Sequence, residues 1–236
     1  ILHKTWEVRE GFVYQPRSLD NEIAKVRSLP EGPILLLDHA DNCGSGGTQD
    51  VMTVVERVFR AGLEDVIVGA VWDPIAVGKM QEAGVGAELS LSLGGNTDMP
   101  SIGECGRPFH VVGTVKVLTD GKWIVHGPMY HGVEVDMGPT ALLDIGGMAI
   151  VVISYHHEPW DRGIFTSVGI QPEHHHYILL KSRIHYRAGF ADLVRHTVTL
   201  DGSGVTTSEN SKLDYQNLRR PIYPLDSPSW PETSAA

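Results

Sequence analysis

ILLLDHADNCGSGG, residues 34–47, is the stretch that decides the fold of this chain. Its first four residues form an unbroken apolar run, which is typical of a strand buried on both faces. After the polar and glycine-rich part, apolar residues recur at helical spacing from 51 to 59. A second buried strand is predicted at 66–71, and Asp73-Pro74 predicts the start of a helix that runs to about residue 83. This alternation of strands and helices predicts a parallel sheet with right-handed crossovers.

The middle of the chain has a different pattern, with turn signals between short apolar runs. A strand is predicted at 87–93, and the turn at 119–122 predicts a hairpin between 109–118 and 123–125. Further elements are predicted as a hairpin of 141–145 with 148–154, a strand at 177–180, a helix near 184–194 and a strand at 196–200. We therefore expect an α/β fold, with a mainly parallel sheet flanked by helices and an antiparallel β-hairpin insertion.

Composition excludes several classes of protein. The 236 residues carry a formal net charge of −10, which argues against binding to nucleic acid or to an anionic membrane. No apolar run approaches the roughly 18 residues of a membrane span, and no signal peptide opens the chain. Because only two cysteines are present, a reducing compartment is expected, and we predict a cytoplasmic protein.

The chain divides into three parts. It opens at Ile1 rather than Met, so we expect that residue 1 is not the start of the gene product and that residues 1–33 are an entry segment. Ser18, with Asp20, is expected to cap a short helix in this segment. Residues 34–226 form the predicted α/β domain, and the Pro- and Ser-rich residues 227–236 form a predicted flexible tail.

The first candidate site is the loop that follows the strand at 34–37. Ligands of parallel sheets bind beyond the carboxyl ends of the strands, and glycine-rich loops that enter helices offer N–H groups to anions. The candidate residues are Asp38, Asp41, Asn42, Gly46 and Gly47, whose carboxylates could hold a metal or orient a substrate amine. In the alternative interpretation, the polar residues only cap the loop and helix, with Thr48 or Asp50 as the helix cap. Cys43 is either a nucleophile or a small residue that fills the loop.

The second candidate site follows the strand at 177–180. Lys181, Ser182 and His185 lie at the predicted start of a helix, where Ser182 can cap the helix and the basic side chains suit a carboxylate or phosphate. The alternative is a structural Ser cap among solvated basic residues.

Histidines are the third candidate, as the pair His156-His157 and the triplet 174–176. Consecutive side chains point in different directions, and neither His-Glu-x-x-His nor Cys-x-x-Cys is present. We therefore predict no metal ligand in this chain, although a self-contained metal hydrolase built on these histidines stays a third hypothesis.

The motifs together resemble one family. The run from Asp38 to Gly47 resembles the D-x-x-D-N-x-G-G-G signature of the microcystinase C (MlrC)-like zinc metallopeptidases, with departures at Cys43 and Ser45. The resemblance continues through the segments 72–74, 83–86, 93–95, 181–188 and 219–226.

The resemblance is to the C-terminal half of such proteins, and it implies a supporting role in catalysis. It also implies that residues 1–33 continue from a missing N-terminal half. It implies a zinc-dependent peptidase or amidohydrolase whose zinc ligands lie in the N-terminal half, where zinc-bound water attacks the amide. The loops at Asp38 and at Lys181-Ser182 would form the substrate side of an interdomain active site, and the chain alone would be inactive. The implied partners are a peptide or small amide substrate and the N-terminal half, and a homo-oligomer is left open. The alternative function is a non-catalytic α/β module that binds a small anion or other ligand.

Overall fold

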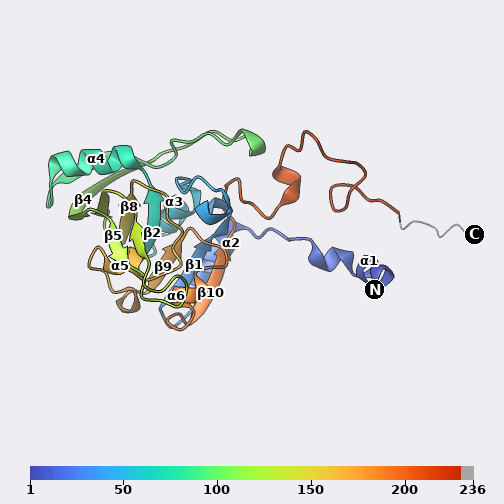
Figure 1. The fold of residues 1–236 in the computed structure, drawn as a ribbon, viewed down its shortest axis with the longest axis horizontal. Coiled ribbons are helices and arrows are strands. Elements are labelled where there is room, and N and C mark those ends of the chain that lie inside the picture. Colours follow the sequence, from blue (N-terminus) through green and yellow to red (C-terminus); the bar gives the residue numbers. More distant parts are fainter. Residues whose placement is uncertain (230–236) are drawn as a thin grey trace, which may run out of the picture.

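The computed structural model describes residues 1–229 (Figure 1). The strands are β1 (Ile34–Asp38), β2 (Val66–Trp72), β3 (Glu88–Leu93), β4 (Phe109–Thr119), β5 (Lys122–Ile124), β6 (Glu134–Asp136), β7 (Thr140–Asp144), β8 (Met148–Ile153), β9 (Tyr177–Leu180) and β10 (His196–Leu200). The α-helices are α1 (Leu2–Glu7), α2 (Leu19–Val26), α3 (Thr53–Arg60), α4 (Pro74–Ala83), α5 (Gly163–Thr166) and α6 (Arg187–Phe190).

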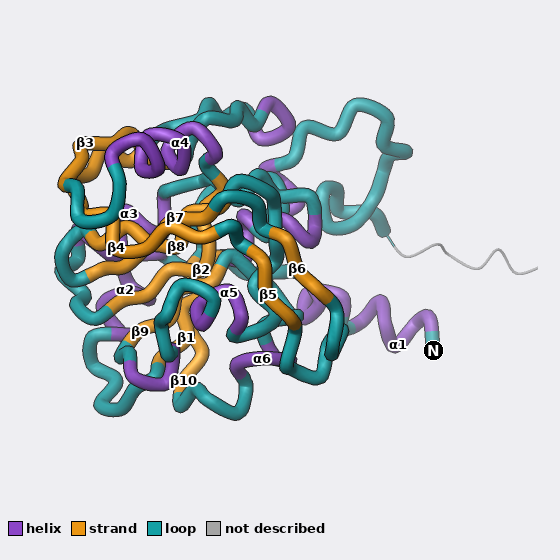
Figure 2. Tube along the Cα trace, turned by 60° about the vertical axis from the view of Figure 1, so that its left-hand side comes forward, coloured by secondary structure: helices purple, strands orange, loops and turns teal. Residues whose placement is uncertain are grey.

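Within residues 1–229 the main sheet has eight strands in the order β10-β1-β9-β2-β8-β7-β4-β3. The first five strands of this order are mutually parallel, and β7, β4 and β3 extend the sheet with antiparallel pairs. Strands β5 and β6 form a separate antiparallel pair, which runs beside the main sheet (Figure 2). The predicted α/β fold with an antiparallel hairpin is therefore confirmed.

Alternate residues of the central strands enter two hydrophobic cores, one on each face of the sheet. Leu36 of β1 and Val68 of β2 pack in the core covered by α2, α3 and α4. Leu37 and Ile67 pack in the opposite core, which is covered by α5, α6 and the β5–β6 pair. Strands buried on both faces require apolar residues at every position, which explains the unbroken runs that predicted β1 and β2.

Helix starts follow their caps in two places. Ser18 Oγ accepts a hydrogen bond from the Asn21 N–H at the start of α2, as predicted. Asp73 Oδ1 accepts from the Ala76 N–H at the start of α4, and its other oxygen accepts from the Gly94 N–H. Helix α3 has no side-chain cap, so the prediction that Thr48 or Asp50 caps it is wrong.

Two other predictions about the middle and end of the chain are wrong. Strand β4 pairs with β3 and β7, whereas β5 pairs with β6, so the turn at 119–122 joins strands of different sheets and not the arms of a hairpin. The predicted helix at 184–194 is reduced to the four residues of α6. The second hairpin, β7 with β8, is confirmed.

The segments at the two ends of the described chain extend to the same side of the body (Figure 1). They contact each other, since the rings of Trp6 and Tyr223 lie 6.1 Å apart and Arg9 stacks over both. Most of the predicted tail 227–236 lies outside the described residues. No helix within residues 1–229 combines the length and the apolar character needed to cross a bilayer.

Candidate functional site

Both candidate loops lie at the carboxyl edge of the parallel strands. Asp38 ends β1 and Lys181 follows β9, its neighbour in the sheet, so the two side chains meet although they are 143 residues apart. Sequence analysis placed them in separate loops; the pairing of β1 with β9 brings them together.

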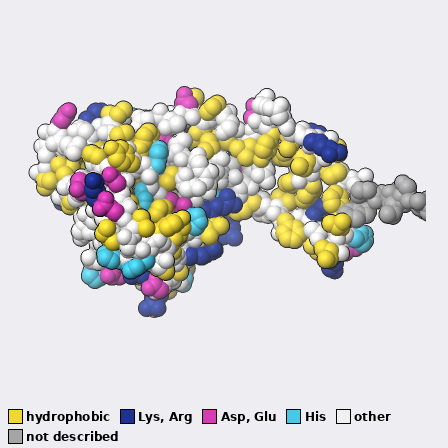
Figure 3. All heavy atoms as spheres, viewed as in Figure 1, with side chains coloured by type: hydrophobic (Ala, Val, Ile, Leu, Met, Phe, Trp, Pro, Cys, Tyr) yellow, Lys and Arg dark blue, Asp and Glu magenta, His cyan; other side chains and the backbone are white. Residues whose placement is uncertain are grey.

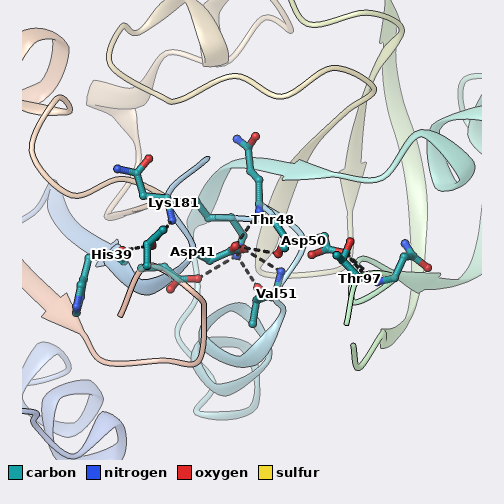
Figure 4. Close-up of polar contacts among 12 residues, drawn as sticks. His39, Asp41, Thr48, Asp50, Val51, Thr97 and Lys181 are labelled. Carbon is teal, nitrogen blue, oxygen red and sulfur yellow. Dashed lines mark hydrogen bonds and ion pairs between the residues drawn. The ribbon is translucent and has the colours of Figure 1, made fainter. Parts of the chain in front are cut away.

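Lys181 is fully buried at the centre of a polar cluster (Figure 4). Its Nζ donates to Asp38 Oδ2 at 3.0 Å, to Asp41 Oδ2 at 2.8 Å and to the carbonyl oxygen of Val51. Both carboxylates are also fully buried, so the predicted alternative of solvated basic residues is wrong for Lys181. A buried ammonium needs such partners, because burial of an unpaired charge is prohibitively costly.

The cluster is electrostatically asymmetric. Burial raises the pKa of Asp38 to about 6, against the opposing effect of Lys181. Burial works to lower the pKa of Lys181, but the two carboxylates outweigh it and raise that pKa above its ordinary value. The other oxygen of Asp38, Oδ1, is buried without a hydrogen-bond partner among residues 1–229. Lys181 therefore stays charged, and within residues 1–229 it is the only hydrogen-bond donor to the Asp38 carboxylate.

Asp41 fixes the shape of the glycine-rich loop. Its Oδ1 accepts from the Gln49 N–H at 2.7 Å and from the Thr48 hydroxyl, and its Oδ2 accepts from the Val51 N–H at 2.9 Å. Together with Lys181 these bonds satisfy both oxygens, which ties the start of the loop to its end. Asp41 is therefore oriented toward the loop backbone and not toward solvent.

Asn42, Gly46 and Gly47 shape the remainder of the loop. Asn42 is buried, and its Oδ1 accepts from the Gly44 N–H. Gly46 has a φ of 94°, and a Cβ at Gly47 would lie 2.8 Å from the Asn42 backbone, so the turn requires glycine at both positions. The N–H groups of this loop close on Asn42 and Cys43 carbonyl oxygens, as the 2.9 Å bond from Gly47 to Asn42 illustrates.

Ser182 and His185 share one partner, Glu158, which sequence analysis did not select as a site residue. The Ser182 hydroxyl donates to Glu158 Oε1 at 3.0 Å, so the prediction that Ser182 caps a helix is wrong. His185 Nδ1 lies 2.8 Å from Glu158 Oε2. The carboxylate is 4% exposed at its side chain, whereas the His185 side chain is 49% exposed. Glu158 therefore orients a histidine that reaches solvent.

The two candidate loops meet at this carboxylate. A Cβ added at Gly44 would lie 1.8 Å from Glu158 Oε2, so only glycine lets the loop after β1 pass beside Glu158. Ser182, His185 and the glycine-rich loop thus form one rim around Glu158, with the Lys181 cluster buried beneath it.

Comparison with known proteins places this chain in a family. The family described as MlrC C-terminus matches residues 36–217. The chain belongs to this family. It is similar to Microcystinase C of Sphingomonas sp., with 27% identity over 210 residues, which are 89% of this chain and 39% of the relative. It also resembles a solved structure from Mesorhizobium sp. BNC1, provisionally named a metallopeptidase, with a TM-score of 0.79, 26% identity, and coverage of 96% of this chain and 44% of that one.

This member of the MlrC C-terminus family thus spans less than half the length of both relatives. No three His, Cys, Asp or Glu side chains within residues 1–229 are grouped so that they could hold a metal ion. The Lys181 cluster does not fit a metal either, because its buried ammonium already occupies the space between the two carboxylates.

In this MlrC C-terminal domain the two histidine clusters lie at opposite ends of the parallel strands. His156 and His157 follow β8 at its carboxyl end, whereas the triplet 174–176 precedes β9, which runs in the same direction. His157 is buried between the Trp123 and Trp160 rings, and burial lowers its pKa to about 4. The hypothesis of a single metal site that uses both clusters is therefore wrong, because the clusters lie at opposite ends of the strands.

Cys43 does not have the environment of a nucleophile. Burial, with Glu158 and Asp41 adding to it, raises the pKa of this thiol to about 12. Because only the thiolate attacks, the interpretation of Cys43 as a residue that fills the loop is favoured.

Glu158 could have been found from its position after a buried parallel strand, where polar residues face ligands.

Proposed function

We propose that this chain is the C-terminal part of a zinc-dependent peptidase or amidohydrolase, and that its rim around Glu158 forms the substrate side of the active site. Zinc, in this proposal, is held by the other part of the longer protein and supplies Lewis-acid chemistry there. Family membership and both relatives support a peptidase-related role. The observation that carries the proposal is the Glu158–His185 pair at the carboxyl edge of the sheet.

His185 is well placed to contact a substrate amide. Its Nδ1 is engaged by Glu158, which leaves Nε2 on the solvent-facing side of a half-exposed ring. A histidine can hold or release a proton near neutral pH, and a carboxylate at Nδ1 fixes the ring orientation. In the proposed reaction, His185 Nε2 binds the substrate amide and orients it, and Glu158 and Ser182 hold the histidine in place.

The other candidate residues support the rim from beneath or beside it. They are Asp38, Asp41, Asn42, Gly46, Gly47 and Lys181. Lys181 is the point that both loops share, since it binds Asp38 and Asp41 while Ser182 follows it directly. In the proposal this cluster keeps the rim rigid while substrate binds. Substrate contacts come from His185 and the exposed part of the glycine-rich loop, because Ser182 is itself buried and donates its hydroxyl to Glu158.

The test compares the chain alone with the longer protein that includes its N-terminal part. Hydrolysis of a panel of short peptides is measured by release of free amines, with and without a chelator. We expect metal-dependent hydrolysis by the longer protein and none by the chain alone. In the longer protein, Glu158→Gln and His185→Gln are expected to lower kcat by about 100-fold, the loss expected when a substrate lies about 1 Å from its reactive position.

His110 provides the matched control, because it is an exposed histidine of β4 whose Nδ1 lies 2.9 Å from the Ser92 hydroxyl, away from the rim. His110→Gln is expected to leave kcat unchanged. Wild-type kcat in both rim variants would refute the role of the rim, and absence of amide hydrolysis by the longer protein would refute the reaction. Ligand binding without hydrolysis would favour the alternative of a non-catalytic binding module.

A further inference from the structure

A large cavity lies apart from the buried Lys181 cluster. It has a volume of about 910 Å³ and lies between the segment before α2 and the segment after β10. Arg183 lines it, and this residue stands between Ser182 and His185 in the chain. The cavity therefore adjoins the rim of the proposed active site.

Three arginines line the cavity, and none of its lining residues within 1–229 is Asp or Glu. This is unusual for a chain whose formal net charge is −10. Figure 3 shows dark-blue side chains gathered where the body meets the projecting terminal segments. Arginines that converge on a cavity without acidic residues in its lining favour an anionic ligand.

The three arginines differ in how far neighbouring residues neutralise their positive charge. Arg17 lies 3.7 Å from Glu22, which also pairs with Lys25. Arg9 donates from Nη1 to the Trp6 carbonyl oxygen, but its Nε is buried without a hydrogen-bond partner. Arg183 makes no hydrogen bond or ion pair with any residue of the described chain. It is close enough to Tyr14 to oppose the rise in the Tyr14 pKa that burial and Asp201 cause.

The other walls indicate more than a bare anion site. Phe12, Tyr223 and Pro224 give apolar surface, and Gln15 and Asn210 give amide groups that can bond to a peptide backbone. A cavity of this volume lies in the range that holds drug-sized ligands, whereas phosphate would leave most of it empty.

We propose that this cavity binds a carboxylate-bearing side chain of a short peptide, with Arg183 as the residue that selects for the negative charge. Arg183 forms the charged hydrogen bonds to the carboxylate, Arg9 adds positive charge, and the apolar walls bury the neighbouring part of the peptide. That the bound peptide is the substrate rests on the proposed function; the cavity's preference for acidic peptides does not.

The test is equilibrium binding to the 236-residue chain by isothermal titration calorimetry. The probes are acetyl-Ala-Glu-Ala-amide, the matching Gln peptide and inorganic phosphate. We expect the Glu peptide to bind at least about tenfold more tightly than the Gln peptide at low salt, and the ratio to fall as salt rises. Arg183→Gln is expected to abolish the ratio, and Arg183→Lys to retain part of it.

Arg60→Gln is the matched control, because Arg60 is an exposed arginine of α3 that lines no part of this cavity. It is expected to leave the ratio unchanged. Equal binding of the two peptides, an unchanged ratio in Arg183→Gln, or phosphate binding as tight as that of the Glu peptide would overturn the proposal. Because no hydrolysis is measured, failure here is distinct from failure of the proposed reaction: an inactive longer protein with an intact Glu preference would overturn only the reaction.

Discussion

Replacement of Lys181 by Met tests the buried cluster most directly. The variant removes a fully buried ammonium that binds two buried carboxylates and one carbonyl oxygen. Asp41 would keep three other donors, but Asp38 would keep none. Removal of one partner from a buried ion pair costs about 3–5 kcal/mol, because the remaining charge is left uncompensated. We expect Lys181→Met to lower the free energy of unfolding by this amount at neutral pH.

Urea unfolding followed by tryptophan fluorescence measures this loss. If the cost comes from the stranded carboxylate, Lys181→Met with Asp38→Asn should recover about 1–3 kcal/mol of it, since the amide carries no charge. Lys116→Met is the control: Lys116 pairs with Asp144 at 3.4 Å on the surface, and such pairs contribute about 0–1 kcal/mol. A loss below about 1 kcal/mol in Lys181→Met, or a double variant less stable than the single one, would refute this account.

Three further outcomes are expected. The folded-state pKa of Asp38 is raised from 3.8 to about 6, so its contribution to stability is present below pH 3.8 and is lost as pH rises through 6; Asp38→Asn should remove this decline in unfolding free energy, as measured by urea titrations at several pH values. The pKa of His157 is lowered from 6.5 to about 4, so its contribution is present above pH 6.5 and is lost as pH falls through 4; His157→Phe should reduce acid sensitivity in that window, and an unchanged acid limb would contradict it. Gly44→Ala should displace Glu158 and therefore lower kcat of the longer protein. Gly78 of α4 has no atom near its Cβ position, so Gly78→Ala should instead raise the free energy of unfolding by about 0.5–1 kcal/mol, as measured by thermal unfolding.

Local pattern was enough to predict the strands of the main sheet and the fold class, but not β6. Ile34 to Leu37 must be apolar at every position because β1 is covered on both faces, so its burial is visible in the sequence. Asp73-Pro74 likewise predicted the start of α4, because a cap and the residue after it interact within one turn.

Pairings between distant segments could not be predicted in this way. The turn at 119–122 has the residues of a hairpin, but β4 reaches β7 and β5 reaches β6, which depends on the sheet as a whole. Ser182 has the position of a helix cap, yet its hydroxyl donates a hydrogen bond to Glu158, which is 24 residues away in the chain. The candidate loops were correctly placed at strand ends, whereas the buried state of Lys181 became apparent only in three dimensions.

The position of β1 in the sheet has a consequence for synthesis of the protein. Both hydrogen-bonded neighbours of β1, β9 and β10, come from the last third of the described chain. A nascent chain therefore exposes an unpaired strand with four consecutive apolar residues, 34–37, on the ribosome until well over a hundred further residues have been translated. Association of this strand with the wrong partner is the characteristic hazard of such long-range pairing, and chaperone binding during translation would be directed to residues 34–37.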